Sequence, residues 1–144
     1  MAARTPYAPG IGRALHGILL AFPIALFTSA IASDVAYLNT GEMQWTNFSS
    51  WLIAGGLLFA GLVLLWAIAD AVRSRKTGGL TRSLIYLIIL IIMFVLGFIN
   101  ALHHSRDAWS SVGAVGLTLS ILTALLAVAA GWVLHTRPVR SEVM

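Results

Sequence analysis

Four histidines are the residues of this chain best suited to chemistry, and each lies at the edge of a long apolar segment. His16 begins the first segment, His103 and His104 end the third, and His135 ends the fourth. Ionisable side chains are costly in hydrocarbon, so those at its edge raise the question of a functional role. Imidazole nitrogens also bind haem iron and exchange protons near neutral pH. The histidines therefore direct the search towards cofactor binding.

An acidic residue accompanies the histidines at one edge of the membrane. His16 and Asp34 are 18 residues apart, which is five helical turns, so they share a face about 27 Å apart. Across a helical bundle, Asp34 can meet His103 or His104. These two histidines are adjacent and point about 100° apart, so both cannot face one interior site. The sequence leaves open which of them faces inward.

At the opposite edge, His16 and His135 have equal depth on the first and last segments. The first and last helices of a closed four-helix bundle are commonly neighbours, and two facing histidines can ligate a b-type haem from both sides. We therefore predict His16 and His135 as possible haem-iron ligands. The predicted cofactor-binding residues are His16, His104, His135 and Asp34. The alternative is that each histidine is interfacial and hydrogen-bonds water or lipid head groups.

The elements that must position these residues are four long apolar segments, at about 16–38, 50–72, 80–103 and 108–136. Of the 144 residues, 59% are hydrophobic and only 10% are charged. Each segment reaches the roughly 20 residues that a helix needs to cross about 30 Å of hydrocarbon. Short connections favour an up-down-up-down arrangement. We predict an all-α integral membrane bundle that forms a single domain over residues 1–144.

The basic residues predict the orientation of this bundle. Eight flank the segment ends on one side (Arg4, Arg13, Arg73, Arg75, Lys76, Arg82, Arg137 and Arg140), and only Arg106 lies on the other. The positive-inside rule then places both termini in the cytoplasm. The net charge of +4 is accordingly read as a topology signal, with the lipid bilayer and not nucleic acid as the partner.

The chain contains no set of residues typical of a catalytic site. It has no cysteine, which excludes disulfides, iron–sulfur clusters and c-type haem attachment. No nucleophile–base set, glycine-rich phosphate loop or pair of catalytic carboxylates appears. We assign no catalytic residues and expect no catalysis by this chain on its own.

Small residues recur along one face of the fourth segment at intervals of three, four and seven. They are Gly113, Gly116, Ser120, Ala127 and Gly131. Small side chains let helix backbones approach closely, and this approach drives helix packing in lipid. We predict that this face packs within the chain, with dimerisation as the alternative.

Three stretches of the sequence resemble the domain-of-unknown-function 2231 family of bacterial membrane proteins. They are Leu15-His16-Gly17 through Leu26 with Asp34, then Asn100 to Trp109, then Gly131-Trp132. The likeness covers roughly residues 14–136, although Gly17 stands where the family commonly has proline. It implies a four-helix protein of the bacterial inner membrane. Some members occur with quinoprotein sugar or aldehyde dehydrogenases, which implies a redox setting and suspected haem binding by the matching histidines.

Two functional hypotheses follow. The first is a redox subunit that holds b-type haem or a quinone through some of the histidines and passes electrons between a periplasmic dehydrogenase, or a respiratory complex, and the membrane. The second is a non-catalytic bundle that anchors or stabilises partner subunits of a larger membrane complex. A small transporter is less well supported, because the segments carry few polar groups in mid-membrane and no pair of broken helices.

Overall fold

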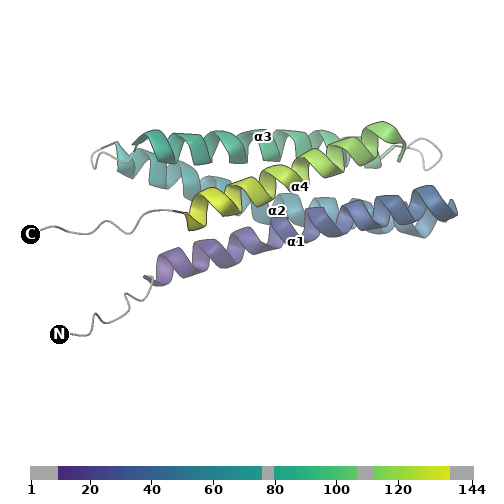
Figure 1. The fold of residues 1–144 in the computed structure, drawn as a ribbon, viewed down its shortest axis with the longest axis horizontal. Helices are drawn as coiled ribbons and strands as arrows, with labels where there is room; N and C mark the ends of the chain where they lie inside the picture. The colour runs from purple at the N-terminus through teal and green to yellow at the C-terminus, as the bar shows by residue number, and fades with distance from the viewer. Residues whose placement is uncertain (1–9, 76–79, 107–111, 137–144) are drawn as a thin grey trace, which may run out of the picture.

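Four helices make up the computed structural model, which describes residues 10–75, 80–106 and 112–136 (Figure 1). They are α1 (Ile11–Thr40), α2 (Met43–Ser74), α3 (Leu80–His104) and α4 (Ala114–His135). No strand occurs in these ranges. The all-α prediction is therefore confirmed.

The helices alternate in direction around a closed square. α1 packs against α2 and α4, and α3 packs against the same two helices, so within the described ranges α1 and α3 are diagonal to each other. Figure 1 shows the start of α1 and the end of α4 at the same end of the bundle. Between α1 and α2 the chain turns at Gly41, whose φ of 70° is the left-handed conformation that glycine adopts without steric cost.

Each of the four helices is long and apolar enough to cross a membrane. Large apolar side chains cover the outside of the bundle. Leu65 in mid-helix is 66% exposed, for example, and Trp132 is 73% exposed. Such a surface is stable against lipid and not against water. The orientation of the termini stays a prediction, since four of the basic residues that carry it (Arg4, Lys76, Arg137 and Arg140) lie outside the described ranges.

The observed helices differ from the predicted segments mainly at one end of the bundle. α2 begins at Met43 and not near residue 50, so only Gly41 and Glu42 remain between α1 and α2. Polar residues in these extra turns lower the local hydropathy, so a hydropathy criterion does not detect the start of the helix. Thr46 and Ser49 are nevertheless buried and pack this part of α2 against the bundle. The predicted start of the fourth segment at residue 108 lies outside the described residues.

The inward faces of the two diagonal helices follow the same register. In α1 the shared inward positions are 16, 20, 23, 27, 30 and 34, and in α3 they are 86, 90, 93, 97, 100 and 104. Each α3 position therefore comes 70 residues after its α1 counterpart. Steps of four and three residues are the period of left-handed helix bundles. Because of this shared register, side chains at matching depth face each other across the bundle axis.

The middle of the bundle is apolar and closely packed. The Phe27 ring fills the space beside two glycines, and a Cβ added at Gly56 would lie 2.5 Å from its Cε1 atom. At Gly97 an added Cβ would lie 3.1 Å from Leu57 and 3.5 Å from Phe27. Glycine thus makes room for a large ring at the centre of the membrane span. This dry layer separates the polar residues at the two ends.

Candidate functional site

All four helices meet at Asp34, which is buried near the end of α1. His104 Nε2 on α3 lies 3.0 Å from Asp34 Oδ1, and Ser49 on α2 donates its hydroxyl hydrogen to the same oxygen. Ser120 on α4 donates to Asp34 Oδ2 at 2.6 Å. Each carboxylate oxygen therefore has a donor, as a buried charge requires. We call Asp34, Ser49, Asn100, His104 and Ser120 the Asp34 cluster.

The hydrogen bonds of His104 fix how many protons its pair with Asp34 carries. Its Nδ1 atom lies 3.0 Å from the main-chain oxygen of Asn100, which only accepts, so Nδ1 carries a hydrogen. The contact between Nε2 and Asp34 needs one further hydrogen, on either the nitrogen or the oxygen. In both arrangements the pair has no net charge. Removing that hydrogen would leave two acceptors facing each other.

A second path of hydrogen bonds closes the Asp34 cluster into a ring. The Asn100 side-chain amide donates to Ser120 Oγ at 2.9 Å, and Ser120 in turn donates to Asp34. Since the Asn100 main chain also binds His104, the ring runs from Asp34 through three residues and back. Asn100 Oδ1 is the buried side-chain atom of the described residues that has no hydrogen-bond partner. The ring leaves Asp34 little freedom to move.

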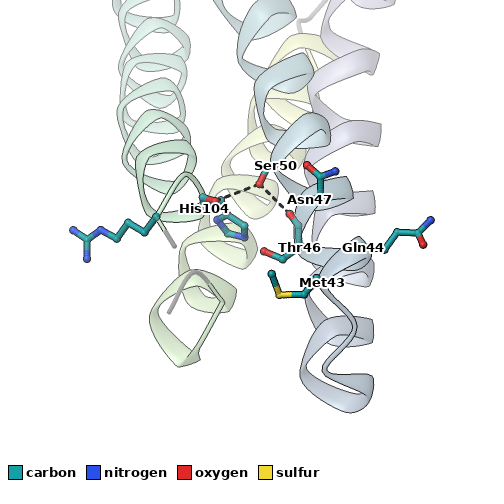
Figure 2. Close-up of a pocket in the computed structure, with 7 residues that line it drawn as sticks. Met43, Gln44, Thr46, Asn47, Ser50 and His104 are labelled. Carbon is teal, nitrogen blue, oxygen red and sulfur yellow. Dashed lines mark hydrogen bonds between the residues drawn. The ribbon is translucent and has the colours of Figure 1, made fainter. Parts of the chain in front are cut away.

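The Asp34 cluster is sealed, although a cavity lies directly beside it. The side chains of Asp34 and His104 are both 0% exposed. A cavity of about 470 Å³ is lined by Met43, Gln44, Thr46, Asn47, Ser50, His104 and Arg106. Figure 2 shows Ser50 joined to the main-chain oxygens of Thr46 and His104, with Gln44 pointing away. His104 thus presents its main chain to this cavity and its ring to Asp34.

A different arrangement holds the histidine at the other end of the bundle. His16 Nε2 lies 2.7 Å from the Tyr86 hydroxyl on α3, and the His16 ring packs against the Trp66 ring on α2 in a T-shaped arrangement with centroids 5.4 Å apart. His16 is buried. We call these three residues the His16 cluster. No charged residue takes part in these two contacts.

The structure does not place the two predicted iron ligands in one site. The His16 ring points into the bundle towards Tyr86, whereas His135 is exposed and its Nδ1 lies 2.8 Å from the Gly131 oxygen of its own helix. An axial histidine offers a ring nitrogen, usually Nε2, to iron. In His16 and His104 that atom is bound to a side chain of the bundle. The described geometry therefore does not fit a haem between these histidines.

Of the two adjacent histidines, His104 faces the interior. It is buried, while His103 is only half-buried. The 100° offset that adjacent helical residues show accounts for this difference.

Four of the five small residues predicted to pack lie inside the bundle. Gly116, Ser120, Ala127 and Gly131 are buried, whereas Gly113 precedes α4 and is exposed. A Cβ added at Gly131 would lie 3.0 Å from Ile24 on α1, so the two helices approach closely there. Ser120 has a second role, since it also binds Asp34.

Sequence reasoning missed Tyr86, Trp66 and Ser49. A signal for Tyr86 exists in the sequence: Tyr86 and His104 are 18 residues apart, as are His16 and Asp34. When two helices carry polar residues at the same spacing, the polar residues of one helix can face those of the other at both ends of a bundle. Ser49 and Trp66 carry no such signal, because serine and tryptophan are common near membrane interfaces.

The comparisons with known proteins agree with this architecture. A family described as a predicted membrane protein, domain of unknown function 2231, matches residues 12–135. The match contains both clusters and all but the edges of the described bundle. No curated protein and no solved structure matches the chain.

Proposed function

The chain belongs to this family of predicted membrane proteins, and we propose that it is a non-catalytic subunit that anchors a partner protein in the membrane. The sealed Asp34 cluster is the observation that carries the proposal. Ionisable groups within a membrane span usually indicate a ligand or proton pathway. Here the carboxylate is fully satisfied by donors from the other three helices, so a structural role explains its presence.

A rigid bundle suits an anchor. Polar contacts between helices stabilise membrane bundles, and a buried polar network favours one arrangement of the helices when its atoms have partners, as all but Asn100 Oδ1 do in the Asp34 cluster. The Asp34 cluster fixes all four helices at one end, and the His16 cluster joins α1, α2 and α3 at the other. The partner would then meet a surface of constant shape.

The turn between α1 and α2 is the proposed contact region for this partner. Bulky side chains at the start of α2 are exposed: Met43, Trp45, Phe48 and Trp51. Aromatic residues and methionine are enriched in protein interfaces. On the predicted orientation, this end faces the periplasm, where a dehydrogenase would dock.

Site-specific photo-crosslinking tests this proposal in native membranes. A photoreactive amino acid replaces Phe48, and a matched control carries it at Leu65, which is also exposed but lies in mid-helix. We expect Phe48 to give one protein adduct of defined mass and Leu65 to give only lipid adducts. Protein adducts equal at both positions, or at neither in a correctly folded chain, would overturn the anchor.

The predicted orientation can be tested by labelling, since the chain has no cysteine of its own. Gln44→Cys and Arg75→Cys place single thiols at opposite ends of the bundle. If both termini lie in the cytoplasm of a bacterial inner membrane, a membrane-impermeant reagent added from the periplasm labels only Gln44→Cys. Labelling of Arg75→Cys alone would reverse the orientation.

A quinone-linked redox subunit is the second candidate function, and the cavity beside His104 favours it. Pockets near a membrane interface with a few converging polar groups are typical ligand sites. Thr46, Asn47 and Ser50 supply such groups here. Ser50→Trp places a large ring at the wall of this cavity, and Ser50 itself makes no hydrogen bond to Asp34. A photoreactive quinone analogue should label the wild type and not this variant, and equal labelling would exclude the cavity as its site.

The haem binding that the sequence suggested can be tested with one absorption spectrum. Since the described histidines point away from a common site, we expect the purified protein to show no Soret band and no change between its oxidised and reduced spectra. A stoichiometric b-type spectrum that disappears in His16→Ala would overturn this expectation and restore the redox hypothesis.

A further inference from the structure

A groove between α1 and α4 at the His16 end has the form of a lipid site. Its volume is about 400 Å³, and it is lined by Arg13, Ala14, Gly17, Ile18, Ala21, Leu134 and His135. The α1 residues of its floor lie on one helix face, because they are spaced by three and four. Most of them are small, and a Cβ added at Gly17 would have no atom within 4 Å. The floor is therefore open.

The groove is apolar along its length and cationic at one end. From Arg13 to Ala21 it runs along roughly 12 Å of helix, which is most of the thickness of one leaflet's hydrocarbon. Its head is formed by Arg13 and His135. A free phosphate would leave the apolar floor uncovered, whereas a phospholipid covers both parts at once.

Of the described arginines at this end, Arg13 and Arg75 are not engaged by a side chain of the bundle, and of these two Arg13 lines the groove. Arg73 lies 3.3 Å from Asp70, and Arg82 donates to Val133 and Thr136 near the end of α4. Within the described ranges, Arg13 forms no ion pair with a carboxylate. A guanidinium group matches the geometry of a phosphate with two parallel hydrogen bonds.

His135 completes the head of the groove. Its Nδ1 hydrogen bonds the main chain at Gly131, so the ring is held and Nε2 is directed away from that bond. Four described arginines and one aspartate lie at this end (Arg13, Arg73, Arg75, Arg82 and Asp70), so the surrounding field attracts anions.

We propose that this groove binds one anionic phospholipid, with the lipid phosphate at Arg13 and His135 and one acyl chain along Gly17 and Ala21. The site is independent of the proposed anchor function and of the Asp34 cluster. It would fix a lipid between the first and last helices, where the bundle closes.

Native mass spectrometry of the purified chain tests the site directly. Phosphatidylglycerol and phosphatidylcholine are added separately in detergent, and the retained lipid is measured. We expect about tenfold more retained phosphatidylglycerol, reduced to the phosphatidylcholine level in Arg13→Gln. Arg75→Gln, which removes a charge at the same end, should retain the wild-type preference.

The groove itself is tested by filling it. Gly17→Leu should abolish retention of both lipids, while Ala54→Leu, which adds the same bulk on the exposed face of α2, should not. If Gly17→Leu lowers the helical content, Ala21→Leu takes its place. Retention unchanged in the groove variants or in Arg13→Gln would overturn the proposal. Displacement of the lipid by millimolar inorganic phosphate would also overturn it, in favour of a simple phosphate site.

Discussion

The two ends of the bundle each bury a histidine, but they supply it with different hydrogen-bond partners. At each end a buried histidine meets a side chain of the diagonal helix, 70 residues away in the sequence. At one end the partner of histidine is the carboxylate of Asp34, and at the other it is the neutral hydroxyl of Tyr86. The two histidines occupy equivalent positions in the bundle, so the ends differ in the partner of the histidine, a carboxyl group at one end and a hydroxyl group at the other.

This difference decides how much surrounding structure each histidine needs. A buried carboxylate must have donors on both oxygens, and the Asp34 cluster recruits one residue from each of the other helices to supply them. His16 has a hydroxyl group as its hydrogen-bond partner, and the Trp66 ring packs against it. The charged end is therefore expected to be the more sensitive to substitution.

Removing the histidine of the charged end should have the largest effect. His104→Ala leaves Asp34 with two serine hydroxyls and no imidazole partner in a buried site. We expect the free energy of unfolding to fall by about 3–5 kcal/mol, the usual cost of leaving a buried charge unpaired. Unfolding by sodium dodecyl sulfate in mixed micelles measures it.

The charge itself is tested by a second variant. Asp34→Asn combined with His104→Ala removes the histidine and the negative charge together, so part of the loss should be recovered. If the double variant lost as much free energy of unfolding as the two single variants together, Asp34 and His104 would not be coupled. The two ends would then differ in packing and not in charge.

The serine on α2 should give the next largest effect. Ser49→Ala removes a donor to the Asp34 carboxylate, and a hydrogen bond to a charged group contributes about 1.5–3 kcal/mol. Ser50→Ala is the matched control, since Ser50 donates only to main-chain oxygens. The same unfolding assay should show a clearly smaller loss for Ser50→Ala. Equal losses of unfolding free energy in the two variants would mean that the bond to Asp34 is not what stabilises this end of the bundle.

The apolar layer between the two ends can be tested at Gly56. In Gly56→Ala the new methyl group meets the Phe27 ring, so we expect a loss of about 1–3 kcal/mol from overpacking. Gly61→Ala on the same helix is the control, because its nearest neighbour, Phe94, would lie at an ordinary 3.6 Å. A thermal-unfolding midpoint lowered equally in both would contradict close packing around Phe27.

Much of the fold could be predicted from hydrophobic segments alone. Apolar length fixes the number of helices, and short connections fix their alternation. The first turns of α2 escaped because Gln44, Thr46 and Asn47 lower the local hydropathy, although the helix continues through them. The shared register of α1 and α3 also escaped, because matching positions carry different residue types. Phe27 matches Gly97, for instance, so no sequence similarity reveals the relation.

The candidate site could be predicted only in part. The position of Asp34 at the same membrane edge as His103 and His104 predicted a contact across the bundle, and Asp34 does bind His104. Equal depth alone also suggested a pair between His16 and His135, but depth does not fix the direction of a side chain around the helix. His16 turns inward to Tyr86, while His135 follows a buried leucine and is exposed.

The smallest predicted effect belongs to the hydrogen bond between Tyr86 and His16. Tyr86→Phe keeps the ring and removes the hydroxyl group that binds His16, so the loss should be about 1 kcal/mol, as for an ordinary hydrogen bond. The unfolding assay that is used for His104→Ala checks this value. If Tyr86→Phe lowered the free energy of unfolding as much as His104→Ala does, the carboxyl group of Asp34 would not explain the difference in stability between the two ends. A small loss would instead place the main polar contribution to stability at Asp34.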